Sequence, residues 1–308
     1  MRIWVSIFAG AVAFCTLAGC DDQESGKPQA KSEKHESTVT GLAVARLGPG
    51  WQLVSDKRVS VWGVVPVSEA APPDSLDSIR AALAVSMLPP RNSVQIADLI
   101  NRTSFDVELP GGPAPAPPGS SILLTETPWN GDTLLLWVEA FPTIPAGARH
   151  VTVEFDPRTV AAFRPLGDPS ALPIPASGPQ RAQMMYELAL IQGSTQNRET
   201  QYAIVHLPDD PSGSGKQDRP VTGADLVDSI YDAPDAVRFA AAAAEFGELL
   251  RGNPAVRDLS CSDVIALAEG TSLPDPNGRR AQLIDLMRRA EPLIDLPRGD
   301  ATLRSDAN

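Results

Sequence analysis

The chain has 308 residues, of which 26 are basic and 38 acidic, and its formal net charge is -12 at pH 7. An acidic surface repels nucleic acid and anionic lipid headgroups, which excludes a nucleic-acid-binding protein and a membrane contact made by basic side chains. The 30 prolines and the 5% share of aromatic residues favour strands joined by irregular loops over the dense core of an α/β enzyme. The length allows one large domain or two modest ones.

The first twenty residues have the pattern of a secretion signal. Arg2 gives a short positive start, and residues 3–17 form an apolar run that is too short to span a bilayer comfortably. The run ends in LAGC at residues 17–20, which is similar to the bacterial lipobox, in which the cysteine is diacylated and becomes the first residue after cleavage. We therefore predict a signal peptide over residues 1–19 and a lipid anchor at Cys20. An ordinary signal peptide with a chance cysteine is the alternative.

A short polar segment follows the predicted anchor. Residues 21–38 contain no large apolar side chain, so they cannot bury enough surface to offset the entropy of ordering. We predict a flexible tether over residues 20–40. Asp21 is similar to the signal that retains lipoproteins in the inner membrane of enteric bacteria. The predicted location is therefore the cell envelope, on a membrane that faces the periplasm, with the inner membrane favoured.

Cysteine usage limits the chemistry of the chain. Cys15 would leave with the signal peptide and Cys20 would carry lipid, so that Cys261 remains as a free thiol. A disulfide within one chain and a zinc site made of cysteines are then excluded. Because Cys261 lies beside a predicted helix start, we expect a small buried residue there and not a nucleophile.

The first predicted elements after the tether are short strands and one helix. Apolar residues alternate over residues 42–67, and Pro66 would restrict the last strand to the edge of a sheet. A helix is expected to begin near Ser75 and to end before the prolines at 89 and 90. Its apolar stripe consists of Leu76, Ile79, Leu83 and Met87.

Apolar alternation predicts further strands in the middle of the chain. They are expected at residues 122–125, 134–139, 151–155, 186–188 and 203–206. The pattern is typical of an antiparallel sheet, and we expect the last two of these strands to pair with each other.

Three consecutive helices are predicted after Pro234. The first runs to Gly252, and its five alanines at 240–244 leave a face thin enough for another element to approach closely. Ser260 opens the second helix with a pattern similar to a capping box, and Gly270 ends it. The third places Leu283, Ile284, Met287 and Ala290 on one side and is expected to stop before Pro292.

Four segments carry longer motifs. Residues 88–110 are LPPRNSVQIADLINRTSFDVELP, and residues 238–251, 260–268 and 278–290 are RFAAAAAEFGELLR, SCSDVIALA and GRRAQLIDLMRRA. They resemble the segments LPPxxxVRxEELINxFxYxYP, RFAAAVAAFGxLLR, SYDDVxxLA and GYRAEFxxLVxxA of a family of bacterial lipoproteins that carry a von Willebrand factor type A domain. The first precedes that domain and the others follow it. Cys261 replaces an aromatic residue of the family pattern.

The von Willebrand domain itself is missing from this chain. After Phe141, nine residues (PTIPAGARH) lead directly to residues 151–167, VTVEFDPRTVAAFRPLG, which resemble the strand that follows the domain in the family. Nine residues cannot fold as that domain, so the metal-dependent ligand binding of the family is not carried over. We expect that the two flanks form one body and that residues 134–139 and 151–155 are neighbouring strands of one sheet.

One motif favours the opposite conclusion. Asp210, Ser212 and Ser214 form the D-x-S-x-S pattern of a metal-ion-dependent adhesion site, and hydroxyl and carboxylate oxygens are suitable ligands for Mg²⁺. Pro208 and Pro211 bracket the motif, and no helix is predicted after it. We interpret it as a loop between strands, with a metal site as the alternative.

The two histidines in the predicted folded part have no catalytic spacing. His150 is expected at the start of a strand and His206 at the end of another. Neither belongs to an HExxH-type pattern, and no motif indicates a Ser-His-Asp triad. We expect each ring to be hydrogen-bonded or solvent-facing, and we predict no cofactor.

These observations predict an α+β protein with an antiparallel, β-sandwich-like body over residues 41–232, a helical segment packed on it over 233–292, and a polar tail over 293–308. Its expected function is that of a membrane-tethered, non-enzymatic protein-interaction or scaffold lipoprotein, with a protein of the cell envelope as partner. Metal-dependent adhesion through Asp210, Ser212 and Ser214 is the alternative. A hydrolase without a recognisable motif is a third hypothesis.

Overall fold

The computed structural model describes residues 50–67, 75–104, 120–140, 150–167, 172–175, 182–194, 196–207, 217–256 and 259–295. The chain divides into two compact units, residues 1–38 and residues 39–308, and every described element belongs to the second unit.

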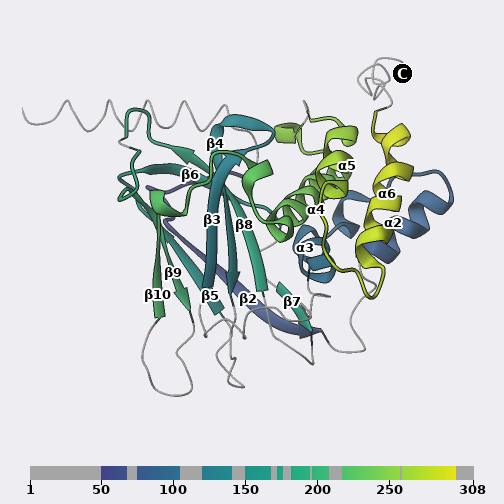
Figure 1. The fold of residues 1–308 in the computed structure, drawn as a ribbon, viewed down its shortest axis with the longest axis horizontal. Coiled ribbons are helices and arrows are strands. Elements are labelled where there is room, and N and C mark those ends of the chain that lie inside the picture. Colours follow the sequence, from purple (N-terminus) through teal and green to yellow (C-terminus); the bar gives the residue numbers. More distant parts are fainter. Residues whose placement is uncertain are drawn as a thin grey trace, which may run out of the picture. The chain divides into compact units, whose positions relative to one another are not determined.

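The described strands form two five-stranded sheets (Figure 1). One, which we call the covered sheet, has the order β1-β6-β8-β4-β3, and the other, the open sheet, has the order β10-β9-β5-β2-β7. The covered sheet consists of β1 Gln52–Leu53, β6 Val160–Pro165, β8 Ala182–Leu190, β4 Asn130–Ala140 and β3 Ser120–Thr127. The open sheet consists of β10 Gln217–Thr222, β9 Gln201–Leu207, β5 His150–Phe155, β2 Val59–Val67 and β7 Leu172–Pro175. All pairs are antiparallel except β2 with β7.

The two sheets bury one common core between them. Trp62 and Phe155 come from the open sheet, while Phe163 and Tyr186 come from the covered sheet, and all four are fully buried. The rings of Phe155 and Phe163 stack with centroids 4.1 Å apart, and the Trp62 indole N–H donates to the Tyr186 hydroxyl. Burial raises the pKa of that hydroxyl, so it stays protonated. The predicted β-sandwich is confirmed.

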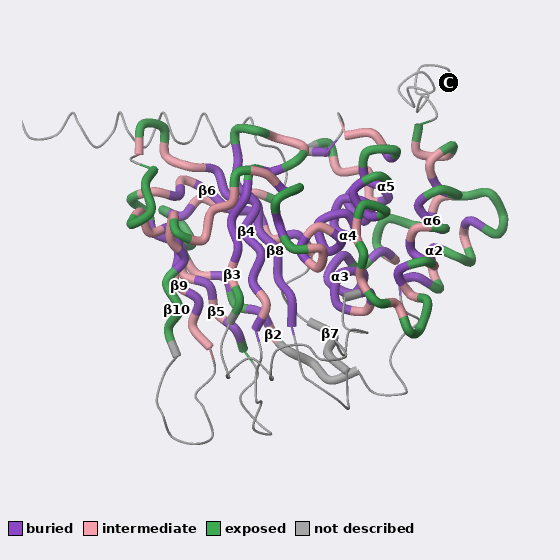
Figure 2. The backbone as a smooth tube through the Cα atoms, in the orientation of Figure 1, coloured by how far each residue is buried: buried purple, intermediate pink, exposed green. Residues whose placement is uncertain are grey.

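Helices cover the other face of the covered sheet (Figure 1). They are α2 Ser75–Ala84, α3 Ile96–Ser104, α4 Asp235–Arg251, α5 Cys261–Glu269 and α6 Arg279–Ile294. Their apolar side chains form a second core with Leu135, Trp137 and Met185 of the sheet. Since β4 and β8 contribute to both cores, their residues are buried almost without interruption, whereas β9 and β10 include more exposed residues (Figure 2). The predicted α+β class, with C-terminal helices packed on the sheets, is confirmed.

Helix ends follow the predicted chemistry in two of the three C-terminal helices. Gly252 ends α4 in the left-handed region with φ 65°, and the Ser260 side chain accepts the backbone N–H of Asp263 at the start of α5. The predicted stop before Pro292 is wrong, because α6 continues to Ile294. Proline in the last turn removes a single donor, and the N–H of Asp295 still bonds to the carbonyl of Glu291 at 3.0 Å.

The stripe predicted for the first helix is correct for three residues. Leu76, Ile79 and Leu83 are buried, whereas Met87 is 63% exposed. The reason is that α2 ends at Ala84 and Ser86 adopts φ 56°, which turns the chain before Met87 can follow the helical period.

Two predicted strand pairs are wrong. β4 and β5 lie in different sheets, so the chain changes sheet between residues 140 and 150, and β9 pairs with β5 and β10 but not with β8. Apolar residues of β4 and β5 nevertheless share one core, because both strands face the space between the sheets. Alternation along a strand determines which side chains turn inward, but it carries no information on the neighbouring strand.

The prediction of an edge strand at Pro66 is wrong for β2 as a whole, because β7 lies beyond it. Residues 59–63 of β2 pair with β5, and residues 64–67 pair with β7. Among the described strands, the half that contains Pro66 is therefore paired on one side, which is compatible with its missing N–H.

A buried ion network joins the helices to the covered sheet. The guanidinium of Arg164 on β6 donates to Glu187 on β8 at 2.6 Å and to Glu248 on α4 at 2.8 Å. The second oxygen of Glu187 accepts from Thr133 at 2.8 Å, and that of Glu248 accepts from Asn253 at 2.6 Å. All carboxylate oxygens of the network are thus hydrogen-bonded.

Helices α3 and α4 approach each other closely at Gly247. The alanines at 240–244 are all fully buried, as the sequence predicts. A Cβ atom at Gly247 would lie 2.7 Å from Cγ1 of Ile96 and 3.3 Å from Cδ1 of Leu99. The absence of a side chain at this position therefore sets the distance between the two helices.

We expect Gly247→Ala to destabilise the protein. The overpacking costs about 1–3 kcal/mol, while the better helix propensity of alanine returns about 0.5–1 kcal/mol. Urea unfolding should show a net loss, and Gly247→Val a larger one. Gly131→Ala, where an added Cβ meets no atom within 4 Å, is the control. A Gly247→Ala protein more stable than the original would contradict this packing.

Cys261 is expected to resist thiol reagents in the native state. Its side chain is fully buried at the start of α5, as predicted, and burial, together with the negative charges of Glu291 and Asp295, raises its pKa to about 12. Modification followed by absorbance should be slow at pH 8 and become fast in denaturant. The Cys261→Ala variant is the control, because any modification that it shows comes from another cysteine. Rapid native modification that this variant lacks would refute the burial.

Candidate functional site

The outer face of the open sheet presents polar side chains from adjacent strands. Along β5, Val151, Val153 and Phe155 turn into the core, whereas Thr152 and Glu154 turn outward. On β2, Val61 is 47% exposed. No described helix makes extensive contact with β2, β5 or β9. Within the described part of the chain, this face is therefore open to solvent, unlike the outer face of the covered sheet.

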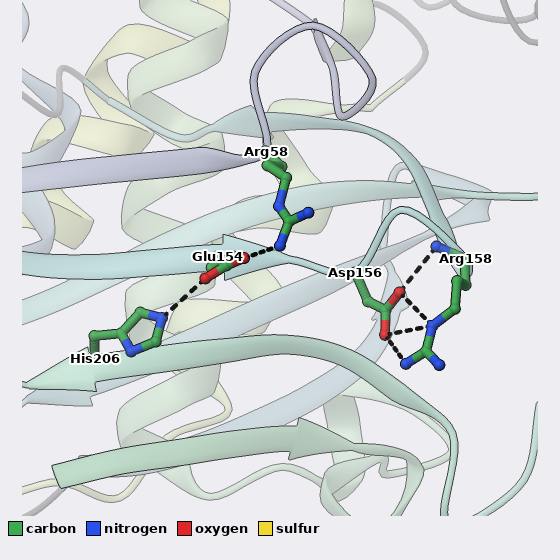
Figure 3. Close-up of polar contacts among 5 residues, drawn as sticks. All are labelled: Arg58, Glu154, Asp156, Arg158 and His206. Atoms are coloured by element: carbon green, nitrogen blue, oxygen red, sulfur yellow. Dashed lines mark hydrogen bonds and ion pairs between the residues drawn. The ribbon is translucent and has the colours of Figure 1, made fainter. Parts of the chain in front are cut away.

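A row of hydrogen-bonded charged and polar groups crosses this face, and Figure 3 draws three of its members, Arg58, Glu154 and His206. Arg58, directly before β2, donates to Glu154 on β5. The other oxygen of Glu154 lies 3.3 Å from Nε2 of His206 on β9, and Nδ1 of His206 lies 2.7 Å from Asp218 on β10. We call Arg58, Glu154, His206 and Asp218 the charged row. It joins four strands in the order in which they pair.

The register of the strands explains why these side chains meet. His206 is directly opposite Asp218 in the β9–β10 pair, and opposite Thr152 in the β5–β9 pair. Glu154 lies two residues beyond Thr152 on the same face and so reaches His206 diagonally. Both partners of the His206 ring are carboxylates, and which ring nitrogen donates depends on the tautomer.

The electrostatics of the row come from close pairing. The hydrogen bond from Arg58 holds the pKa of Glu154 below its usual value, and the contact with His206 acts in the same direction. The Glu154 side chain is 28% exposed and that of Arg58 is 55% exposed. Exposed pairs of this kind contribute little to folding stability, with a typical value of about 0–1 kcal/mol. Stability alone therefore gives a weak reason for this arrangement.

A second pair lies at the end of β5, where the chain crosses to the covered sheet (Figure 3). The Asp156 carboxylate accepts the backbone N–H of Arg158 at 2.9 Å and also its guanidinium at 2.6 Å. These bonds to Arg158 hold the pKa of Asp156 below its usual value. Asp156 is nearly buried while Arg158 is 80% exposed. The carboxylate thus fixes the turn, and the arginine presents a positive charge at the border of the face.

The charged row holds its side chains at fixed positions through hydrogen bonds and ion pairs between neighbouring strands. Both ring nitrogens of His206 contact carboxylates, and among the described residues no hydrogen bond joins the ring to a hydroxyl or a thiol. Cys261 is buried in the helical layer. The row therefore offers a fixed pattern of hydrogen-bonded polar groups beside the exposed Val61 side chain.

Several residues singled out in the sequence cannot be placed. Cys20, Asp21, Asp210, Ser212 and Ser214 lie outside the described residues. His150 begins β5 and is exposed. Within the described ranges, no group of three or more His, Cys, Asp or Glu side chains could hold a metal ion. The helices described here also include none with the length and apolar character needed to cross a membrane.

Sequence reasoning missed Arg58, Glu154 and Asp218. A signal for Glu154 was available, because it occupies an outward position in the alternating VTVEF strand. Its partners are 96 residues before it and 52 residues after it in the chain. Their meeting depends on the strand order, which no local pattern determines.

Comparison with known proteins finds one partial match. Residues 181–293 match the family described as the C-terminal region of the uncharacterised protein YfbK. No curated protein and no solved structure matches the chain. The match runs from β8 to α6 and includes the three C-terminal helices, β9 and β10. This part of the chain, which contributes His206 and Asp218 to the charged row, is therefore similar to the YfbK C-terminal region.

Proposed function

We propose that the chain is a membrane-tethered, non-enzymatic protein-interaction or scaffold lipoprotein, derived from a lipoprotein of the von Willebrand type A family that lacks the metal-binding domain. The partner is a protein of the cell envelope, and the outer face of the open sheet binds it. The observation that carries this proposal is the charged row on a sheet face that no described element covers.

The composition of the face supports a protein partner. Specific interfaces combine an apolar centre with a polar rim, and charge complementarity sets orientation and association rate. Val61 supplies exposed apolar surface, and in register it is opposite Thr152, which in turn is opposite His206. Because the charges of the row are already paired, a partner meets a fixed pattern and not mobile side chains.

The similarity of residues 181–293 to the YfbK C-terminal region supports the family origin. The lipobox-like LAGC sequence at residues 17–20 supports the membrane anchor. With a net charge of -12, the chain has to rely on the acyl chains to bind a membrane of anionic lipids.

A photo-crosslinking amino acid in place of Val61 should capture the partner in intact membranes. The same amino acid in place of Met87, which is 63% exposed next to α2, is the control. We expect a discrete crosslinked species from position 61 and none from position 87, as judged by immunoblot and mass spectrometry. Equal capture at both positions, or capture at position 87 alone, would contradict the assignment of the face.

Charge reversal then separates recognition from stability. Glu154→Lys should weaken binding of the captured partner roughly tenfold or more, because it opposes Arg58 and inverts the field of the row. The double variant Arg58→Glu with Glu154→Arg restores the ion pair but leaves the two charges in exchanged positions. It should bind the partner as weakly as Glu154→Lys does. If this double variant regains normal affinity, the row has only a structural role.

Cys20→Ala is expected to release the protein from the membrane. The change removes the thiol that would carry lipid. Because the chain is acidic, it has no basic surface that could hold it on an anionic membrane in place of the lipid anchor. Membrane and soluble fractions should be compared by immunoblot, with Cys261→Ala as the control that stays in the membrane. A Cys20→Ala protein that remains in the membrane after signal cleavage would show that the lipobox interpretation is wrong.

A further inference from the structure

A cavity of ≈ 320 Å³ lies between the β3–β4 turn and the helices α4 and α5. Thr127 of β3, Glu245 of α4 and Asp263 of α5 line it together with Tyr231 from the segment before α4. Its volume is at the lower end of the range of small-molecule sites, which begins at about 300 Å³. The cavity belongs to the side of the covered sheet and contains no residue of the charged row.

Glu245 is the unusual residue of this cavity. It is 1% exposed, and its Oε1 atom has no hydrogen-bond partner among the described residues. Burial, and secondly the charge of Asp263, raise its pKa to about 8, so the carboxyl group is largely protonated at pH 7. A buried polar group without a partner is unfavourable, and such groups point to a role beyond packing.

A second unpartnered acceptor lines the same cavity. Oγ1 of Thr127 is buried and has no hydrogen-bond partner in the described part of the chain. Two polar groups that line one cavity and both lack partners among the described residues indicate a site for a donor from outside the protein.

The charges around the cavity are of one sign. None of the described residues that line the cavity is basic. Its ionisable lining residues are Glu126 from β3, Tyr231 from the segment before α4, Glu245 from α4 and Asp263 from α5. Glu126 and Asp263 are exposed, while Glu245 lies inside. The exposed Tyr231 ring and Leu267 give the walls an apolar part.

We propose that this cavity binds an organic cation, namely an ammonium or guanidinium group on a short apolar stem, with Glu245 as its buried counter-ion. The cation donates to Glu245 and to Thr127, and its stem packs against the apolar wall. The lysine or arginine side chain of a protein and a free small amine share this chemistry. Glu126 and Asp263 attract the cation from solvent, and the Tyr231 ring favours it through a cation–π contact.

Binding should be linked to proton release. In the empty cavity Glu245 holds its proton, whereas a bound cation favours the carboxylate, so the proton passes to the buffer. Since Glu126 and Asp263 are exposed, Glu245 is the group that changes its protonation most. Close to one proton should be released per cation near pH 7, and fewer at pH 9.

The test is calorimetric titration of the whole protein with n-butylammonium chloride, and with an acetylated, amidated Gly-Lys-Gly peptide. n-Butanol, which has the same stem without charge, is the ligand control. Titrations in two buffers of different ionisation enthalpy measure the proton release. We expect both cations to bind at least tenfold more tightly than butanol. A peptide that binds tenfold more tightly than butylammonium identifies a protein side chain as the source, and equal affinities identify a small amine.

Variants then assign the site. Glu245→Gln keeps the size of the side chain without its charge and should lower the affinity for butylammonium at least tenfold and abolish the proton release. Glu269→Gln, on the exposed side of α5 and paired with Arg288, is the matched control and should bind normally. If Glu245→Gln fails to fold, the carboxyl ¹³C shift of Glu245 in the original protein still reports ionisation on titration.

Three results would overturn the proposal: butanol binding as well as butylammonium, undiminished binding by Glu245→Gln, or no binding of either cation at millimolar concentration. Each of these outcomes is independent of the face on the open sheet. Crosslinking from position 61 tests that face and does not involve Glu245.

Discussion

The buried guanidinium of Arg164 is the constraint on which the arrangement of the layers depends. It connects β6 to β8 through Glu187 and connects this sheet to α4 through Glu248. Removing one member of such a network leaves an uncompensated buried charge, which typically costs about 3–5 kcal/mol. Because the bonds are directional, they fix the position of α4 along the sheet more narrowly than apolar packing can. Gly247, adjacent to Glu248 in sequence, then lets α3 pack closely on the same helix.

Helix α4 carries two buried glutamates with different surroundings. Glu248 accepts hydrogen bonds from Arg164 and Asn253, whereas Oε1 of Glu245, one helical turn earlier, has no partner among the described residues. The contrast matters because both lie on a helix that is buried along most of its length. A carboxyl group kept in such a place without a counter-ion weakens the fold as the pH rises, since its folded-state pKa of about 8 exceeds the usual 4.5. The contribution of Glu245 to folding stability is fully present below pH 4.5 and is lost as the pH rises through 8.

Local patterns in the sequence predict well where helices and strands lie and which of their faces are buried. They predict poorly which strands pair with each other. The alternation in β5 and the caps of α4 and α5 were sufficient to place those elements, because each depends on residues a few positions apart. The pairing of β4 with β5 was predicted wrongly, since strand order depends on contacts far apart in the chain. For the same reason, Glu154 was identifiable as an outward residue, but its row with Arg58 and His206 was not. Glu245 lies in the run AAAAAEFGELL, where an acidic residue is also compatible with an exposed helix face.

The two sheets differ in what they need on their outer faces. Strand β4 contains LLLWV and β8 contains AQMMYELAL, so both of their faces require cover, and the helices supply it on one side. Strands β5 and β9 alternate, and their outward residues, Glu154 and His206 among them, suit water or a polar surface. An apolar partner would leave these charges without solvent, which is unfavourable even for paired groups. The partner proposed for the open sheet should therefore carry complementary charges and only a modest apolar centre.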